Sequence, residues 1–252
     1  MSSPVLAVRG LARRFGAVRA VRDVGFSLER GRVAVLLGEN GAGKSTTIRI
    51  ILGFLRQDEG EVSLGAGAIG YVPEQPSFFP WARGEDLLAC TALLHGVPAN
   101  PARRRALEWC DKLPFAPDLL RRRVSSYSQG NRKKFAYLQS LMISPELFIA
   151  DEPFAALDPV SIRCARDLVR ELAVSGVAVL LSSHLISEVG KVYDDVIVIH
   201  GGAVVLRERR EDLGPHADLE ALFLRAIGRE GPRPASAAGP EPDVFRSPCR
   251  RE

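Results

Sequence analysis

The stretch VAVLLGENGAGKST, residues 33–46, joins an apolar run to a glycine-rich loop and decides the fold. The apolar run predicts a buried β-strand. The glycines predict a loop that wraps an anion, because positions without a side chain tolerate positive φ and let several N–H groups point inward. The apolar residues after the loop recur at helical spacing and predict a helix with one face on the sheet: Ile48, Ile51, Leu52 and Leu55. A strand, such a loop and a helix N-terminus together predict a site for a nucleoside triphosphate.

Two residues of this loop bring the chemistry that phosphates need. Lys44 is placed to reach the terminal phosphates, and the Ser45 hydroxyl is a ligand for Mg²⁺. Kinases, GTPases, helicases and transport ATPases share this loop, so the rest of the chain decides the class. The residues predicted to contact the nucleotide here are Gly38, Glu39, Asn40, Gly41, Ala42, Gly43, Lys44, Ser45 and Thr46.

A second apolar run, residues 147–150, ends in two carboxylates, Asp151 and Glu152, followed by Pro153. A carboxylate at such a strand end lies beside the loop, where Asp151 is predicted to hold Mg²⁺ directly or through water. Glu152, one residue on, is placed to polarise the attacking water. An exposed turn is the alternative, and the phosphate loop upstream makes it the weaker one.

Composition limits the class of protein. With 252 residues, 46% hydrophobic and 25% charged, the chain holds one large α/β domain with an insertion or two small domains. No segment approaches the roughly 20 consecutive apolar residues that span a bilayer, and the N-terminus has no leader pattern, which predicts a cytoplasmic location. The four cysteines are far apart, which predicts buried thiols rather than zinc or disulfides. The net charge of +4 comes from dispersed arginines, so no nucleic-acid partner is expected.

The pattern changes along the chain. Alternating residues 24–28 and 61–64 predict an antiparallel β region, whereas the runs 147–150 and 177–181 predict strands of a parallel sheet buried on both faces. Asp158 and Pro159 predict the start of a crossover helix that ends at Gly176. Residues 76–135 show helical spacing, and the proline-rich segment from residue 229 lacks apolar periodicity.

Three short motifs complete the pattern, and their order is informative. Tyr127-Ser128-Gln129-Gly130-Asn131 precedes the carboxylate pair, Ala156-Leu157-Asp158 follows it, and His184 comes just after the next buried strand. Over about residues 5 to 210 the chain thus resembles the ATP-binding subunit of an ATP-binding cassette (ABC) transporter. The motifs stand in that family's order: Walker A loop, helical insertion, signature motif, Walker B strand, D-loop and H-loop.

The resemblance implies a P-loop NTPase fold of the α/β class. It has a mixed, mainly parallel sheet flanked by helices, an N-terminal antiparallel β region and an inserted helical subdomain. On this basis residues 1–75 and 136–228 form the ATP-binding core, and residues 76–135 form the inserted subdomain with the signature motif. Residues 229–252 are a flexible tail.

The resemblance also implies ATP and Mg²⁺ as cofactors and a head-to-tail dimer, with itself or with a related cassette. Each ATP then lies between one Walker A loop and the signature motif of the other subunit, so Ser128 and Gly130 face the γ-phosphate across the interface. His184 contacts the same phosphate, and Asp158 belongs to the nucleotide site. Phe15 matches the aromatic residue that stacks on adenine, with a core role as the alternative. The implied catalytic residues are Glu152, His184 and Lys44; Ser45 and Asp151 hold the metal.

The chain departs from the family pattern at four places. The signature is usually Leu-Ser-Gly-Gly-Gln, and only its serine and second glycine are kept here. Glu74 stands where the family's Q-loop glutamine belongs, with Gln75 next to it, and both stay candidates for that role. Phe154 stands where the family usually has a small hydroxyl residue, and Phe15 where it often has tyrosine.

These features predict a subunit that powers a separate membrane permease. It is expected to lie in the cytoplasm and to be held at the inner face of the cell membrane only through that permease. Export is the favoured direction of transport. A soluble ATPase acting on nucleic acid or the ribosome is the alternative, and a catalytically inactive binding module is a third. The aromatic residues Phe78, Phe79 and Trp81 are predicted either to line a groove for the permease or to pack inside the helical insertion. The transported substrate is a property of the membrane subunits.

Overall fold

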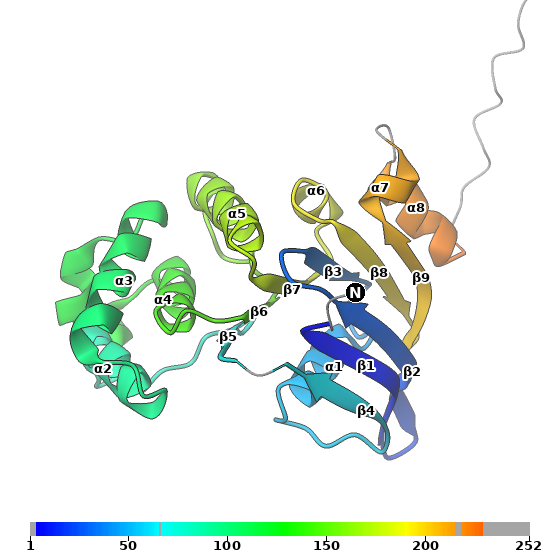
Figure 1. Ribbon diagram of the computed structural model, residues 1–252, viewed down its shortest axis with the longest axis horizontal. Helices are drawn as coiled ribbons and strands as arrows, with labels where there is room; N and C mark the ends of the chain where they lie inside the picture. Colours follow the sequence, from blue (N-terminus) through cyan, green and yellow to red (C-terminus); the bar gives the residue numbers. More distant parts are fainter. Residues whose placement is uncertain (1–3, 66, 215–217, 229–252) are drawn as a thin grey trace, which may run out of the picture.

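The computed structural model describes residues 4–65, 67–214 and 218–228. The predicted tail, residues 229–252, lies outside the described residues. Figure 1 shows two lobes: one is built around the strands, and the other consists of helices from the middle of the chain.

The central sheet has six strands in the order β5-β6-β7-β3-β8-β9. Neighbouring strands run parallel except the pair β8 and β9, which is antiparallel. This arrangement confirms the predicted mixed, mainly parallel sheet. The strands are β3 (Val33–Leu37), β5 (Ile69–Val72), β6 (Leu147–Asp151), β7 (Ala178–Ser183), β8 (Asp195–His200) and β9 (Ala203–Arg209).

Helices cover both faces of this sheet, which explains why its inner strands are apolar throughout. On β3, Val33 and Val35 belong to the core on the side of α5 (Pro159–Val174), whereas Ala34 and Leu36 belong to the core on the side of α1 (Lys44–Ile51). Successive side chains of a strand point to opposite faces, so a strand buried on both faces has no polar alternation.

A three-stranded antiparallel sheet lies beside α1, in the order β2-β1-β4, as the alternating residues predict. Its strands are β1 (Leu6–Phe15), β2 (Val18–Leu28) and β4 (Glu59–Leu64). The buried side chains of β1 and β2 share one core with α1 and the lower face of the central sheet. The phosphate loop is therefore held between two sheets.

The helix after the loop is shorter than its apolar spacing predicts. α1 ends at Ile51, and Leu52 and Leu55 lie beyond its end, half-buried against the same core. Gly53, with φ of 73°, stops the helix because few other residues adopt positive φ without strain. The remaining helices of the strand lobe are α6 (Ile186–Val189), α7 (Arg210–Leu213) and α8 (Leu219–Ala226).

The helical lobe corresponds to the predicted insertion and lies apart from α1 in Figure 1. It contains α2 (Gly84–Leu94), α3 (Ala99–Lys112), α4 (Gln129–Leu141) and the short 3-10 helices η1 (Pro117–Arg121) and η2 (Val124–Ser126). The exact division of the chain at residues 75 and 135 stays a prediction. α4 runs through residue 135, so it belongs to the helical lobe at its start and packs toward the sheet at its end.

The prediction of buried cysteines holds for Cys110, holds in part for the half-buried Cys164 and fails for Cys90, and Cys249 lies outside the described residues. Cys110 is buried in the helical lobe, and burial raises the pKa of its thiol to about 11. Cys90 is exposed on α2, so the prediction was wrong there, because α2 turns this position away from its neighbours. Among the described residues, no helix has the length and apolar character needed to cross a membrane.

Candidate nucleotide-binding site

The loop between β3 and α1 has the close backbone contacts that explain its glycines. A Cβ on Gly38 would lie 2.4 Å from the carbonyl oxygen of Ile199, and one on Gly43 would lie 2.5 Å from that of Ala20. Gly43 also has φ of 107°, outside the range that other residues adopt without strain. Side chains at these positions would push the loop off its neighbours. The loop therefore keeps a main-chain surface free to face an anion at the start of α1.

Lys44 is the buried cation of this loop. Its ammonium donates to the carbonyl oxygens of Gly38 (2.7 Å) and Glu39 (3.1 Å) and lies 3.8 Å from the Glu152 carboxylate. Burial lowers the pKa of Lys44, and the charges of Glu152 and Asp151 oppose that shift. The two carboxylates thus favour the charged form that a phosphate would bind.

A hydroxyl and a carboxylate meet at the end of the loop, as the sequence predicts for a metal. The Ser45 hydroxyl donates to Asp151 Oδ1 at 3.2 Å, and Ser182 on β7 donates to the same oxygen. β6 and β7 are neighbours in the sheet, and this pairing brings Asp151 and Ser182 opposite each other. Oxygen donors of this kind fit Mg²⁺, which takes one or two protein oxygens together with phosphate and water.

Glu152 is held in a buried and strained position beside the loop. Its φ is 45°, and its carboxylate accepts from Ser183 Oγ at 3.4 Å. His184 Nδ1 lies 2.8 Å from Glu152 Oε1. A non-glycine residue at positive φ stores strain, which is common where a side chain is held for a reaction. The carboxylate is therefore fixed between Lys44 and His184 at the edge of the site.

The two Q-loop candidates follow β5, and both are exposed. The Glu74 charge acts on the pKa of Lys44 and of Lys133. Gln75 is neutral and has no such effect in any orientation, so both residues stay candidates for the Q-loop role.

The structure does not bring the signature motif to the loop of its own chain, because α4 and α1 lie in different lobes (Figure 1). Ser128 is the N-cap of α4, and its hydroxyl accepts from the Asn131 N–H at 3.2 Å. The Cβ position of Gly130 would lie 3.0 Å from the Ala156 carbonyl oxygen, so a glycine fits here. The roles of Ser128 and Gly130 in a partner's site stay predictions.

Asp158 and Phe15 stand at the edges of the predicted site. Asp158 caps α5: its carboxylate accepts from the Ser161 N–H (2.9 Å) and hydroxyl (2.6 Å), and these bonds lower its pKa. Phe15 is 48% exposed at the end of β1, with the Arg13 guanidinium 5.0 Å from its ring centre. The core alternative for Phe15 is therefore wrong, the Arg13 guanidinium lies over its ring, and stacking on adenine stays a prediction.

The sequence reasoning saw only a basic stretch after Ser128 and missed that Lys133 and Lys134 are buried there. Lys133 on α4 is 1% exposed, and its ammonium donates to Pro73 O (2.8 Å), Glu74 O (3.2 Å) and Asp151 O (3.1 Å). Helical spacing could not have found this burial, because α4 is buried at every position from Lys133 to Leu138.

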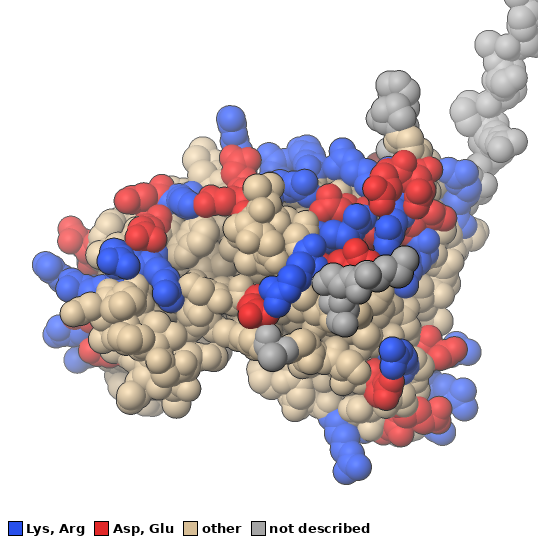
Figure 2. All heavy atoms as spheres, viewed as in Figure 1, with Lys and Arg blue, Asp and Glu red and all other residues tan. Residues whose placement is uncertain are grey.

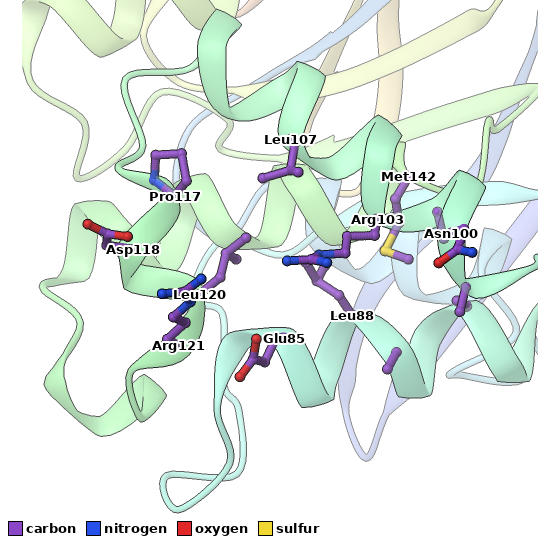
Figure 3. A pocket seen from close by; sticks show the side chains of 14 residues that line it. Glu85, Leu88, Asn100, Arg103, Leu107, Pro117, Asp118, Leu120, Arg121 and Met142 are labelled. Atoms are coloured by element: carbon purple, nitrogen blue, oxygen red, sulfur yellow. The ribbon is translucent and has the colours of Figure 1, made fainter.

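A separate cavity of about 200 Å³ lies in the helical lobe between α2, α3 and η1 (Figure 3). Small and apolar side chains form most of its wall, and none of the predicted phosphate-binding residues reaches it. It is therefore distinct from the nucleotide site. Its lining includes Glu85, Leu88, Ala92, Arg103, Leu107, Leu120 and Met142.

Comparison with known proteins agrees with this geometry. Residues 21–155 match the family model described as ABC transporter. The chain is 31% identical to the Nod factor export ATP-binding protein I of Ralstonia nicotianae, covering 85% of this chain and 70% of that protein. It is 32% identical to the ribose import ATP-binding protein RbsA 2 of Rhizobium etli, covering 91% of this chain and 47% of that protein.

A solved structure described as the ATP binding subunit of an ABC transporter has a TM-score of 0.79 and 27% identity, covering 88% of this chain and 99% of that one. The fold is thus shared with an ATP-binding subunit of an ABC transporter. The chain belongs to the ABC transporter family, as an ATP-binding subunit with ATPase activity.

Proposed function

We propose that this subunit hydrolyses ATP with Glu152 as the residue that orients and polarises water, Lys44 and His184 acting on the phosphates, and Ser45 and Asp151 holding Mg²⁺. One observation supports this assignment most: the buried Glu152 carboxylate lies between the Lys44 ammonium and His184 Nδ1. Lysine and imidazole N–H groups stabilise charge that develops on phosphate oxygens, and a carboxylate is the usual base for water.

Mg²⁺ supplies charge neutralisation at the phosphates when it is bound. The chain's part is to present the Ser45 hydroxyl and the Asp151 carboxylate, which already share a hydrogen bond. Removing divalent cations with EDTA is expected to lower the ATPase rate by more than about 10²-fold. Added Mg²⁺ restores it. Rates measured before and after chelation check this; hydrolysis that continues in EDTA would exclude a metal at Ser45 and Asp151.

The arrangement of the lobes supports a head-to-tail dimer, with a second copy or a related cassette. Ser128 caps a helix whose N-terminus favours anions, yet α4 lies away from the P-loop of the same chain (Figure 1). A partner rotated by half a turn would bring its own Ser128 to this P-loop. Light scattering of the Glu152→Gln variant with and without ATP tests this proposal; a monomer under both conditions would argue against it.

The second partner that we propose is a membrane permease, and the aromatic residues of the Q-loop region support it. Phe78 packs on Phe135 with ring centres 5.1 Å apart, so this ring belongs to the core. Phe79 and Trp81, by contrast, are 63% and 69% exposed and contact each other at 5.4 Å. Phe78 and Phe79 also line a hollow with Tyr71, Pro73 and Leu87. Exposed aromatic pairs beside a groove are typical anchors for a partner helix.

Replacing Trp81 by alanine is expected to abolish recovery of the subunit with its permease while its melting temperature stays within about 2 °C, because the side chain is exposed. Phe78→Ala is the matched control: it removes a partly buried ring and should lower stability by about 3 kcal/mol. Co-purification from native membranes and thermal unfolding measure the two effects. A large loss of stability in Trp81→Ala would mean that the ring packs in the core.

We propose export as the direction of transport, on the basis of the Tyr-Ser-Gln-Gly signature and the similarity to a Nod factor exporter. The similarity to a ribose importer points the other way. In proteoliposomes with the cassette outside, an exporter moves its substrate into the lumen when ATP is added, and an importer moves it out. This experiment begins with identification of the co-purifying permease.

Action on nucleic acid is the alternative, and the surface gives it little support. Figure 2 shows acidic side chains interspersed with the basic ones over the strand lobe, so the face in view carries no continuous basic surface there. A nucleic-acid backbone needs such a surface. Stimulation of the ATPase rate by RNA or DNA would reverse this preference.

A further inference from the structure

Lys133 joins three segments that meet at the nucleotide site. The residue lies on α4, five positions after Ser128, and its ammonium donates to main-chain oxygens of the Q-loop (Pro73, Glu74) and of the β6 end (Asp151). An ammonium has three N–H donors, so the three acceptors account for all of them. The contacts reach main-chain atoms only, which means that they fix backbone position rather than a side-chain rotamer.

The sheet itself does not hold these segments together. The ladder between β5 and β6 ends at the pair Val72 and Ala150. The next residue on the β5 side is Pro73, which has no N–H with which to extend the ladder. From that point on, the Lys133 ammonium supplies the donors between the Q-loop and the end of β6.

Burying the Lys133 ammonium carries a free-energy cost, because the charge loses its hydration. Burial lowers the pKa of Lys133 to about 8, against the charges of Asp151, Glu152 and Glu74. An apolar side chain of similar length would fill the same volume without that desolvation cost. The polar contacts themselves are therefore what distinguishes lysine at this position.

We propose that Lys133 is a positioning residue that locks the Q-loop main chain to the end of β6, so that the signature helix, Glu74 and the Asp151-Glu152 pair move as one unit. Glu152 follows Asp151 directly and is held at positive φ, so a small shift of the β6 end changes where its carboxylate points. This inference rests on the role proposed above for Glu152.

The test replaces Lys133 by methionine, which keeps the length and removes the donors. The control is Leu138→Ala, which removes buried volume from the same helix without touching the Q-loop or β6 oxygens. We expect kcat to fall by about 10- to 10²-fold in Lys133→Met, because misplacement of a reacting group by about 1 Å has effects of this size. KM should stay within about threefold, because the phosphate loop is unchanged.

The second readout is hydrogen exchange of the Glu152 amide in the nucleotide-free protein, which does not depend on catalysis. This amide donates to the Ser182 carbonyl oxygen at 3.2 Å and reports on the end of β6. Exchange there should rise in Lys133→Met and stay at the wild-type level in Leu138→Ala. If the methionine variant does not fold, Lys133→Gln keeps two N–H donors on a shorter neutral side chain and serves in the same comparison. Exchange and kcat that match those of the Leu138 variant would overturn the proposal.

The test of Lys133 and the test of the catalytic role of Glu152 can fail independently of each other. If Glu152→Gln hydrolyses ATP at the wild-type rate, the assignment of Glu152 fails, whatever Lys133 does. If Lys133→Met leaves the exchange of the Glu152 amide unchanged, the positioning role fails even though Glu152 is the base.

Discussion

Glu152→Gln is expected to lower kcat by about 10²- to 10⁴-fold, or about 3 to 5 kcal/mol of barrier, while ATP binding stays near the wild-type level. The amide keeps the shape of the side chain and loses the basic carboxylate that orients water. The contact with His184 persists in altered form, because an amide oxygen or N–H still meets Nδ1. Steady-state ATPase rates and a fluorescent nucleotide titration measure the two quantities.

The control for this variant is Glu108→Gln, which makes the same chemical change at an exposed position of α3, far in sequence from the loop. Its ATPase rate and melting temperature should match those of wild type. A wild-type rate in Glu152→Gln would show that another group activates water. Loss of nucleotide binding in that variant would instead assign Glu152 a role in holding the loop.

Lys44→Ala is expected to lower kcat by about 10²- to 10³-fold and to weaken ATP binding by about 10-fold or more. The Lys44 ammonium lies beside the Glu152 carboxylate and donates to two carbonyl oxygens of the loop. A bound phosphate would accept those hydrogen bonds in place of the carbonyl oxygens. The fold should survive, because the substitution also removes the desolvation cost of a buried charge. Isothermal titration with ATP and circular dichroism test these expectations.

Lys112→Ala removes a lysine of the same charge from the end of α3, where it pairs with Glu171 at the surface. Both kinetic constants should stay at wild-type values in this control, because surface ion pairs contribute little. Equal ATP affinity in wild type and Lys44→Ala would contradict the assigned role of Lys44 in phosphate binding.

Local patterns in the sequence predicted the main elements of the fold for a simple physical reason. Strands buried on both faces must be apolar throughout, as in residues 33–37 and 147–150, and a helix start is marked by its cap, as at Asp158. The phosphate loop was predictable because its backbone geometry excludes side chains at Gly38 and Gly43. These requirements act over a few residues, so they leave a mark that one sequence shows.

The helix boundary after the loop and the exposure of aromatic residues were not predictable in the same way. Leu52 and Leu55 fit the helical spacing, yet α1 ends at Ile51, and Gly53 prevents the helix from continuing while both leucine side chains still pack against the core. Phe78 and Trp81 look alike in the sequence, and only the packing of α4 makes one a core residue and leaves the other exposed.

The sequence by itself determined the nucleotide-binding class, because Lys44, Ser45, Asp151 and Glu152 are identified by short patterns of strand, loop and carboxylate. Tertiary structure alone decided which distant groups meet: His184 beside Glu152, Ser182 on Asp151, and Lys133 on the oxygens of Pro73, Glu74 and Asp151. Strand order sets these contacts, since β6 and β7 are neighbours in space although a helix separates them in the chain. The sequence alone does not distinguish a buried lysine such as Lys133 from a lysine on the surface, because burial depends on the packing of distant segments.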